Sequence, residues 1–301
     1  MTDSFLKFAG SKRGVLSQLA PLLPPASSLR GYRQPFLGGG TPFWQLYADV
    51  RPAVLSDTNE RLTDCYLAVR DHVDALIAEL REHEPAYERA YYDDIRAALN
   101  ARTGSLAQRA GYFMVINRWG FNGLWRVNRA GECNVTFGKT ASGQPPVLCD
   151  EATLRACSTA LRGVDIRHEG FEHTVGEARM GEFVYLDPPY HPVSETADFV
   201  SYTPDGFSYM VQLQGSIFDT PASDHERLLA GLRLMDDRGV AWALSNSDCA
   251  ATRTAYAPWE INTVQRSGGI NCDTAKRGKV SEIVVRGRVR LDAVRQEGAS
   301  P

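Results

Sequence analysis

The stretch Phe183-Val184-Tyr185-Leu186-Asp187-Pro188-Pro189-Tyr190 decides the fold of this 301-residue chain. Its first four residues form a short apolar run that predicts a buried strand. The strand must end at the two prolines, because proline cannot donate to a sheet ladder or to a helix. In an open α/β sheet, ligands bind at the carboxyl ends of the strands. An acid beside a flat ring suits a planar nitrogenous substrate there, although a plain Pro-Pro turn would give the same four letters.

Composition indicates an ordinary soluble globular protein, with 43% hydrophobic and 23% charged residues. No stretch approaches the ~20 apolar residues of a membrane span, and the N-terminus lacks a signal-peptide pattern. The six cysteines are scattered without a C-x-x-C pair, which predicts reduced thiols in the cytoplasm and no metal site. With a net charge of −3, any nucleic-acid surface must come from local clustering. We expect a monomer that contacts no membrane.

Far upstream of residues 183–190, the sequence F-A-G-S-K near the N-terminus leads into an expected helix capped by Ser11. Lys12 would lie in the first turn of that helix, where a positive charge is unfavourable for the helix dipole. The lysine is therefore either placed for a ligand carboxylate or simply solvated.

Two strand ends follow. The expected strand 32–37 runs into Gly38-Gly39-Gly40, where glycine lets the backbone approach a ligand, although a glycine triplet alone is a weak signal. The expected strand 53–56 ends at Asp57. An acid at this place binds ribose hydroxyls in dinucleotide-type folds, but Asp57 is equally a helix cap.

Helical patterns at about 59–80, from Pro85 onward and at 105–117 interrupt the alternation of strands and helices, which predicts an inserted subdomain. The run 117–139 then holds four basic residues and one acid, a net +3. Its Arg, Asn and aromatic residues, on a hairpin turned at 129–132, are groups that read base edges. We therefore favour DNA contact over a solvated basic hairpin.

The alternation resumes after residue 146. We expect strands at 164–167, 183–186, 240–244, 259–264 and 282–286, and helices at 151–161 and 224–237. The loop 266–279 between the last two strands again carries a net +3.

In chain order, the motifs F-A-G-S-K, F-L-G-G-G, S-D-T-N, R-W-G-F-N-G-L-W-R-V-N-R-A-G-E-C-N-V-T-F-G, D-P-P-Y and K-V-S-E-I resemble the Dam-type (D12 class, alpha group) DNA adenine N6-methyltransferases. The resemblance covers residues 5–286. It implies an α/β fold, a Rossmann-like S-adenosylmethionine-dependent methyltransferase sheet with an inserted helical and β-hairpin target-recognition domain. The catalytic domain would comprise 1–58 and 163–290, the target-recognition insertion 59–162, and a disordered tail 291–301.

The resemblance also implies the activity. A methyl group would pass from S-adenosylmethionine, leaving S-adenosylhomocysteine, to an adenine flipped out of double-stranded DNA in GATC or a related site. The catalytic residues would be Asp187, Pro188, Pro189 and Tyr190. The cofactor-binding residues would be Phe8, Lys12, Phe36, Gly38, Gly40, Asp57, Phe171 and Asp187. The DNA-binding residues would be Arg118, Phe121, Asn122, Leu124, Arg126, Asn128, Thr136, Lys276 and Arg277, with Arg126 reading a guanine.

Two positions depart from the family pattern. Phe8 replaces the usual tryptophan, and Thr136 stands where the family often has proline. The segment 208–222 is also longer than is common. The alternatives are a catalytically inactive sequence-specific DNA-binding protein and an RNA adenine methyltransferase. Cytosine-N4 enzymes usually carry serine in place of Asp187, and a Rossmann-type dehydrogenase is disfavoured because Phe43 occupies the place of its third glycine.

Overall fold

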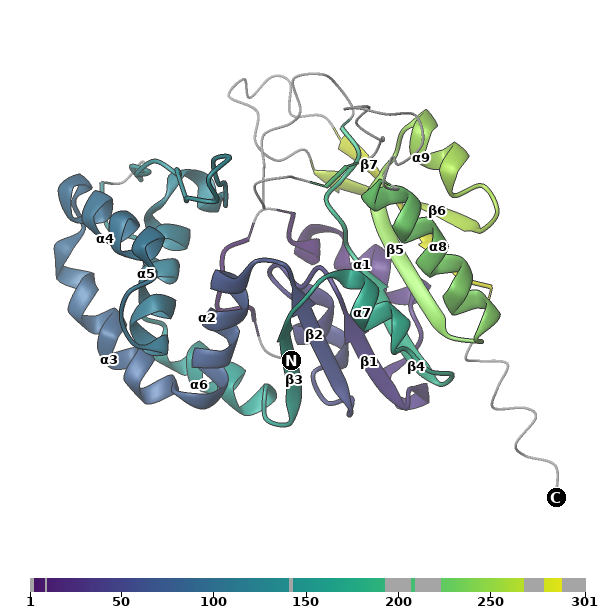
Figure 1. Ribbon diagram of the computed structural model, residues 1–301, viewed down its shortest axis with the longest axis horizontal. Coiled ribbons are helices and arrows are strands. Elements are labelled where there is room, and N and C mark those ends of the chain that lie inside the picture. The colour runs from purple at the N-terminus through teal and green to yellow at the C-terminus, as the bar shows by residue number, and fades with distance from the viewer. Residues whose placement is uncertain are drawn as a thin grey trace.

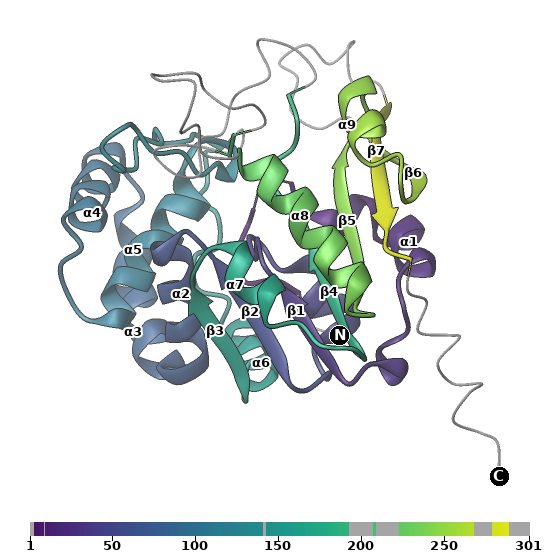
Figure 2. The same ribbon diagram turned by 45° about the vertical axis from the view of Figure 1, so that its right-hand side comes forward.

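The computed structural model describes residues 3–8, 10–140, 143–192, 207–208, 223–267 and 279–288. At its centre lies a seven-stranded sheet in the order β3-β2-β1-β4-β5-β7-β6. The strands are β1 (Gly31–Gln34), β2 (Ala53–Asp57), β3 (Val164–His168), β4 (Glu182–Leu186), β5 (Ala241–Ser247), β6 (Glu260–Ser267) and β7 (Lys279–Arg286). Strands β1 to β5 are parallel, whereas β7 runs antiparallel between β5 and β6 (Figure 2). The predicted α/β class is confirmed.

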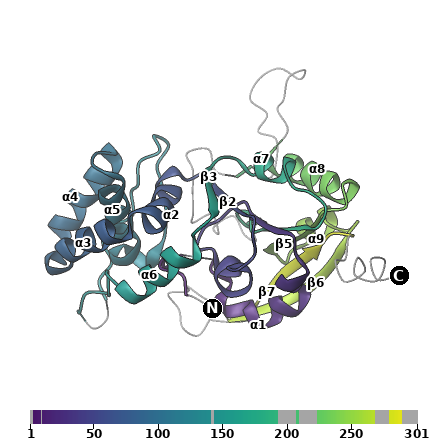
Figure 3. The ribbon, with the colours of Figure 1, turned by 90° about the horizontal axis from the view of Figure 1, so that it is seen from below.

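Helices cover both faces of this sheet. They are α1 (Leu16–Leu19), α2 (Glu60–Asp71), α3 (Val73–His83), α4 (Arg89–Ala101), α5 (Leu106–Trp119), α6 (Glu151–Ala160), α7 (Phe171–Gly176), α8 (Asp224–Asp237) and α9 (Ala250–Ala255). Helices α7 and α8 lie on one face and α1 on the other (Figure 3). Helices α2 to α6 extend beyond β3 (Figure 1). In the described ranges we find no helix with both the length and the apolarity that a membrane crossing needs.

The order of the strands reverses between β1 and β4. From β1 the chain moves outward to β2 and β3, then returns to pair β4 with the free side of β1. Ligands of open α/β sheets bind outside the carboxyl ends of the strands at such a switch point. The loops after Gln34 and after Leu186 therefore meet where a ligand is expected.

Helix α5 is the centre of the inserted part. Ser105 and Gln108 form a capping box that starts it, which satisfies two backbone N–H groups at the helix end. Most of its residues are buried, because α2, α3 and α4 all pack against it. None of its residues is exposed, so the helix is held by its neighbours along its whole length and supports the segments attached to its ends.

Several predicted boundaries are wrong. Strand β1 ends at Gln34 instead of residue 37, since Pro35 has no N–H and Phe36 adopts φ +60°. The helix predicted at 59–80 breaks at His72, whose φ of −136° and ψ of 35° are not helical. Strand β5 continues through Ser247. The expected first helix is a 3-10 turn, one α-turn and a second 3-10 turn.

Some predictions lie outside the described residues. They are the roles of Lys276 and Arg277, the disordered tail 291–301 and nearly all of the long segment 208–222.

Candidate active site and nucleic-acid interface

Lys12 and Asp187 form an ion pair at the switch point of the sheet. Lys12 Nζ donates to Asp187 Oδ2 at 2.6 Å and to the Gly10 carbonyl at 2.9 Å. The lysine side chain is 4% exposed, so the alternative of a solvated lysine is wrong. Its charge is placed against the acid that follows β4.

Asp187 has a second oxygen, Oδ1, which is buried and lacks a hydrogen-bond partner among the described residues. Burial raises the pKa of Asp187, and the charge and hydrogen bond of Lys12 oppose that rise. A buried acceptor without a partner destabilises a fold by about 1–3 kcal/mol. Such an atom fits a ligand that donates a hydrogen bond, as an amino group does.

The loop after Asp187 is fixed by its neighbours. The centroid of the Tyr190 ring lies 4.9 Å from Lys12 Nζ, within the range of a cation–π contact. The N–H of His191 donates to Asn246 Oδ1 at 3.0 Å, and its carbonyl accepts from Ser247 Oγ at 2.7 Å. The extension of β5 that sequence reasoning missed therefore positions the predicted catalytic loop.

Four predicted cofactor residues meet at the carboxyl edge of β1, β2 and β3. The rings of Phe36 and Phe171 stack with centroids 5.2 Å apart and an interplanar angle of 25°. Asp57 accepts from Gly38 N at 3.1 Å and from Asn59 N at 2.9 Å. Asn59, not Asp57, caps α2. Burial raises the pKa of Asp57, and its oxygens keep lone pairs for further donors.

The glycine triplet brings Phe8 to the same edge. Gly38 and Gly40 have φ of +48° and +65°, which favours glycine. A Cβ on Gly39 would lie 2.9 Å from Phe8 Cβ, and one on Gly40 would lie 2.8 Å from the Tyr66 hydroxyl. These glycines are thus required by the packing of the protein itself, a reason that the sequence did not reveal.

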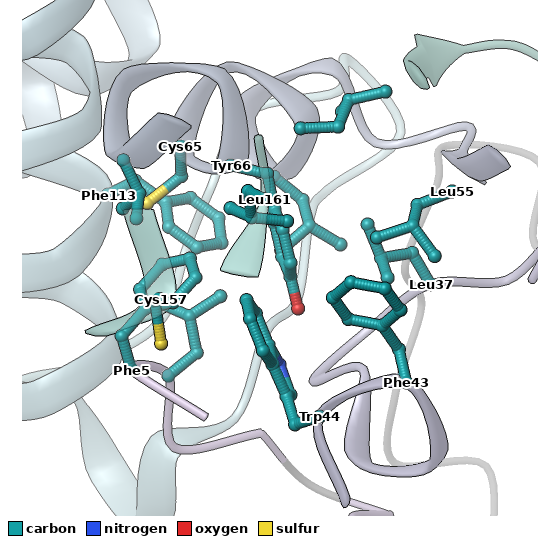
Figure 4. Packing of buried hydrophobic residues seen from close by; sticks show 14 of the residues in the cluster. Phe5, Leu37, Phe43, Trp44, Leu55, Cys65, Tyr66, Phe113, Cys157 and Leu161 are labelled. Atoms are coloured by element: carbon teal, nitrogen blue, oxygen red, sulfur yellow. The ribbon is translucent and has the colours of Figure 1, made fainter. Parts of the chain in front are cut away.

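An N-terminal strap, residues 3–8, runs between the sheet and the inserted helices. Phe5 packs edge-on against Trp44 and Tyr66, with centroids 6.1 and 5.0 Å apart (Figure 4). Arg118 Nη2 donates to the Phe5 carbonyl at 2.7 Å. Arg118, which was predicted to bind DNA, is half-buried, and its Nη2 is bound to the strap.

Two asparagine side chains act as substitutes for a peptide group. Asn117 Oδ1 accepts from Lys7 N at 2.9 Å, while its Nδ2 donates to Lys7 O at 2.6 Å. Asn100 on α4 makes the same pair of bonds with Cys133, at 2.8 and 3.0 Å. Sequence reasoning assigned neither residue. Asn117 fixes the strap that carries Phe8, and Asn100 fixes the basic run 117–139.

That run folds back on itself as an antiparallel ribbon, with isolated bridges Gly120 to Phe137 and Val127 to Cys133. The ribbon and the loop after β4 lie on the same side of the molecule (Figure 1). Trp125 and Val127 are buried and Arg126 between them is exposed, as expected for alternating side chains on a strand. The predicted hairpin turn is confirmed, since Gly131 N bonds to Asn128 O.

The predicted DNA-binding residues of the ribbon differ in exposure. Phe121, Asn122, Arg126 and Thr136 are exposed, whereas Leu124 and Asn128 are half-buried. Asn128 Oδ1 accepts from the N–H groups of Ala130 and Glu132, so this side chain shapes the turn. Arg126 uses two N–H groups on Asn134. An arginine has five such donors, so Arg126 keeps capacity for a base edge.

Within the described residues, no three His, Cys, Asp or Glu side chains gather as a metal site would require. The arrangement instead joins an acceptor for an amino group, an aromatic ring, a second acid and a basic ribbon. Such a set can bind and orient a base and present it to a second ligand at the edge of the sheet.

Comparison with known proteins agrees with this arrangement. The family model of the D12 class N6 adenine-specific DNA methyltransferases matches residues 8–267. A Type II methyltransferase of Lactococcus lactis, M1.LlaDCHI, is 33% identical over 286 residues, 93% of this chain and 94% of the relative. A DNA adenine methylase of Vibrio cholerae is 31% identical over 285 residues, and one of Escherichia coli 29% over 284, with the same two coverages.

The two asparagines predict separable defects. We expect Asn117→Ala to weaken binding of S-adenosylmethionine by tenfold or more, because the strap that carries Phe8 loses two part-buried hydrogen bonds at Lys7, each worth about 1 kcal/mol. The matched variant Asn100→Ala should weaken DNA binding and leave cofactor binding unchanged. Calorimetric titration with each ligand measures both. Equal loss of both ligands in both variants would contradict the separate roles.

Proposed function

Because the chain belongs to the D12 class of N6 adenine-specific DNA methyltransferases, we propose that it methylates N6 of an adenine flipped out of duplex DNA, in GATC or a related site. The observation that carries the proposal is that the two carboxylate oxygens of Asp187 have different surroundings. Its Oδ2 is bound by Lys12, and its Oδ1 is buried without a partner among the described residues. An adenine amino group is a donor that would give Asp187 Oδ1 its missing hydrogen bond. The seven-stranded sheet belongs with the S-adenosylmethionine-dependent fold of this family.

Asp187 Oδ1 and the Pro188 carbonyl accept the two amino hydrogens of the base. Adenine N6 is a poor nucleophile because its lone pair is delocalised into the ring, and these hydrogen bonds favour a more tetrahedral nitrogen. Pro188 and Pro189 restrict the loop, and Tyr190 offers a face on which the flipped base stacks. Most of the catalysis then comes from positioning and fixed charge. Stacking offsets the few kcal/mol that unstacking the base costs.

The residues at the carboxyl edge fit the cofactor of this family. S-adenosylmethionine supplies an electrophilic methyl group on a sulfonium sulfur. Asp57 has lone pairs left for ribose hydroxyls, and the stacked Phe36 and Phe171 offer an apolar wall for an adenine ring. The Phe8 ring lies against Gly38 at the same edge.

The ribbon is the proposed reader of DNA. We assign residues 59–162 to target recognition, and 1–58 with 163–290 to catalysis. Arg126 would bind O6 and N7 of a guanine, the commonest specific contact in the major groove. Exposed Phe121, Asn122 and Thr136 lie on the same ribbon.

The test is methyl transfer from labelled S-adenosylmethionine to unmethylated duplex DNA, with the modified base mapped by sequencing. We expect N6-methyladenine with a shared GATC core. Asp187→Ala should lose about a hundredfold or more in kcat, the usual effect of removing one oriented hydrogen-bonding group. Asp248→Ala is the matched control, since that acid also follows a strand but pairs with Arg253.

Each outcome has a reading. Asp187→Ala as active as the wild type would overturn the role of the carboxylate. Specific DNA binding by the wild type without transfer would indicate the inactive DNA-binding protein, and transfer to RNA alone would indicate the RNA enzyme.

Arg126 predicts a change of specificity. Arg126→Ala should lower discrimination at one guanine by about 1–3 kcal/mol, because a bidentate contact is lost. Arg129→Ala, at the exposed tip of the same ribbon, should weaken binding to all sequences equally and lower the salt slope by about one. Competition binding with single-base variants of the site separates the two. Equal losses on all sequences for Arg126→Ala would contradict base reading.

The pKa of Asp187 predicts an acid limb in the pH profile of kcat/KM. The carboxylate accepts hydrogen bonds only when ionised, and burial raises its pKa, so activity should fall at a higher pH than the ~4 of an exposed aspartate. Lys12 lowers this pKa. Lys12→Met should therefore move the limb to still higher pH, whereas Lys7→Met, which removes an exposed charge from the strap, should not. An unmoved limb in Lys12→Met, with its fold checked by circular dichroism, would refute the assignment.

A further inference from the structure

Glu282 is a buried acid that lies directly against the predicted catalytic loop. It is 3% exposed, and its Oε2 accepts from the Tyr190 hydroxyl at 2.8 Å. Its Oε1 lies 3.1 Å from Arg266 Nε. Glu282 is on β7 and Arg266 is on the neighbouring β6, the last two strands on one side of the sheet. The Glu282 side chain therefore connects both strands to the loop after β4.

The surroundings of Glu282 make a purely structural role costly. The next three residues of β7, Ile283 to Val285, are almost completely buried and apolar. A carboxylate in such a place loses its hydration, and an ion pair commonly fails to stabilise a fold more than apolar residues of equal volume would. A leucine at this position would suit the apolar surroundings, but it would leave the Tyr190 hydroxyl without a hydrogen-bond acceptor.

Glu282 also stands beside the other element that fixes the loop. In the register of the sheet it pairs with Ser247 of β5, the residue that donates to the His191 carbonyl. The side chain of Tyr190 is therefore bound to β7, and the backbone of His191 is bound to the neighbouring position on β5. Burial and the charges of Asp187 and Glu282 raise the pKa of Tyr190 well above its ordinary value, so its hydroxyl remains a donor.

We propose that Glu282, braced by Arg266, is a positioning residue that fixes the plane of the Tyr190 ring for stacking on the flipped base. The proposal rests on the function proposed above. A ring without the hydroxyl bond can swing about its Cα–Cβ bond, and it also loses the preferred plane that a fixed acceptor imposes, since a phenolic O–H lies in the plane of its ring. The bond to Glu282 instead orients the ring beforehand, so less freedom is lost when the base arrives. The same ring already lies 4.9 Å from Lys12 Nζ, next to Asp187.

A double-mutant cycle tests this. Glu282→Leu removes the acceptor, Tyr190→Phe removes the donor and keeps the ring, and the double variant removes both. Because the bond involves a charged group, we expect each single variant to lower kcat about tenfold. If Glu282 acts through the Tyr190 hydroxyl, the double variant should be no slower than Tyr190→Phe. The conservative Glu282→Gln, which keeps an oxygen acceptor, should recover part of the rate.

Glu182→Gln is the matched control. Glu182 is another buried acid, 8% exposed and bound to Arg33 Nε at 2.7 Å, but it begins β4 at the edge remote from Asp187. This variant should unfold at lower urea concentration than the wild type and keep its kcat. If Glu282→Leu shows the same lowered stability with an unchanged kcat, Glu282 is merely structural and the proposal falls.

The remaining outcomes are also decisive. Losses in kcat that multiply in the double variant would show that Glu282 acts by a route other than Tyr190. Should Glu282→Leu fail to fold, Glu282→Gln replaces it in the cycle. The effect of Glu282→Gln on kcat is then measured in the wild type and in Tyr190→Phe. An equally large loss of kcat in both backgrounds overturns the proposal. A wild type that methylates no adenine is the separate failure of the proposed function.

Discussion

The Lys12–Asp187 ion pair is the interaction on which the arrangement of this site depends. It joins the start of the first 3-10 turn to the loop after β4, 175 residues apart in sequence, at the place where the order of the sheet reverses. Removing one partner of a buried pair commonly costs about 3–5 kcal/mol, because the other charge remains without compensation. The pair also leaves Asp187 with one oxygen engaged and the other open to a donor. A structural contact thus produces the chemical asymmetry of the carboxylate.

Backbone segments near the site are bound by amide side chains rather than by additional strands. Asn117, Asn100 and Asn246 each bond to the backbone of a functional segment. A short segment without a strand partner would otherwise leave buried N–H and C=O groups unpaired, which folded proteins avoid. An asparagine amide presents an N–H donor beside a carbonyl acceptor, so it can pair with the C=O and N–H groups of one backbone residue. The strap, the ribbon and the loop after β4 are therefore ordered without extending the sheet.

The sequence predicted the elements of the fold better than their contacts. Short apolar runs such as 183–186 predict strands because periodicity and turn residues are local signals. The resemblance to a known family placed Asp187, Asp57 and Gly38 at one edge, as the structure does. Neither source assigned a role to Glu282 or Asn117, whose partners lie 92 and 110 residues away. Such contacts depend on single positions in the folded chain, and single positions carry no periodicity. The break at His72 escaped for the same reason, because the apolar spacing continues through it.

Helix α5 explains how the ribbon and the cofactor edge keep a fixed relation. Its last turn provides Asn117, which binds the strap at Lys7, and it leads at once into Gly120 and the ribbon. A Cβ on Gly123 of the ribbon would lie 3.0 Å from the Lys7 side chain, so ribbon and strap also touch directly. Phe8, one residue further, packs on the glycines that precede Asp57. The distance between the ribbon and the carboxyl edge of the sheet is thus set by one buried helix end. A displacement of that end would move the ribbon and the strap together, and α5 is also the most buried helix of the insertion.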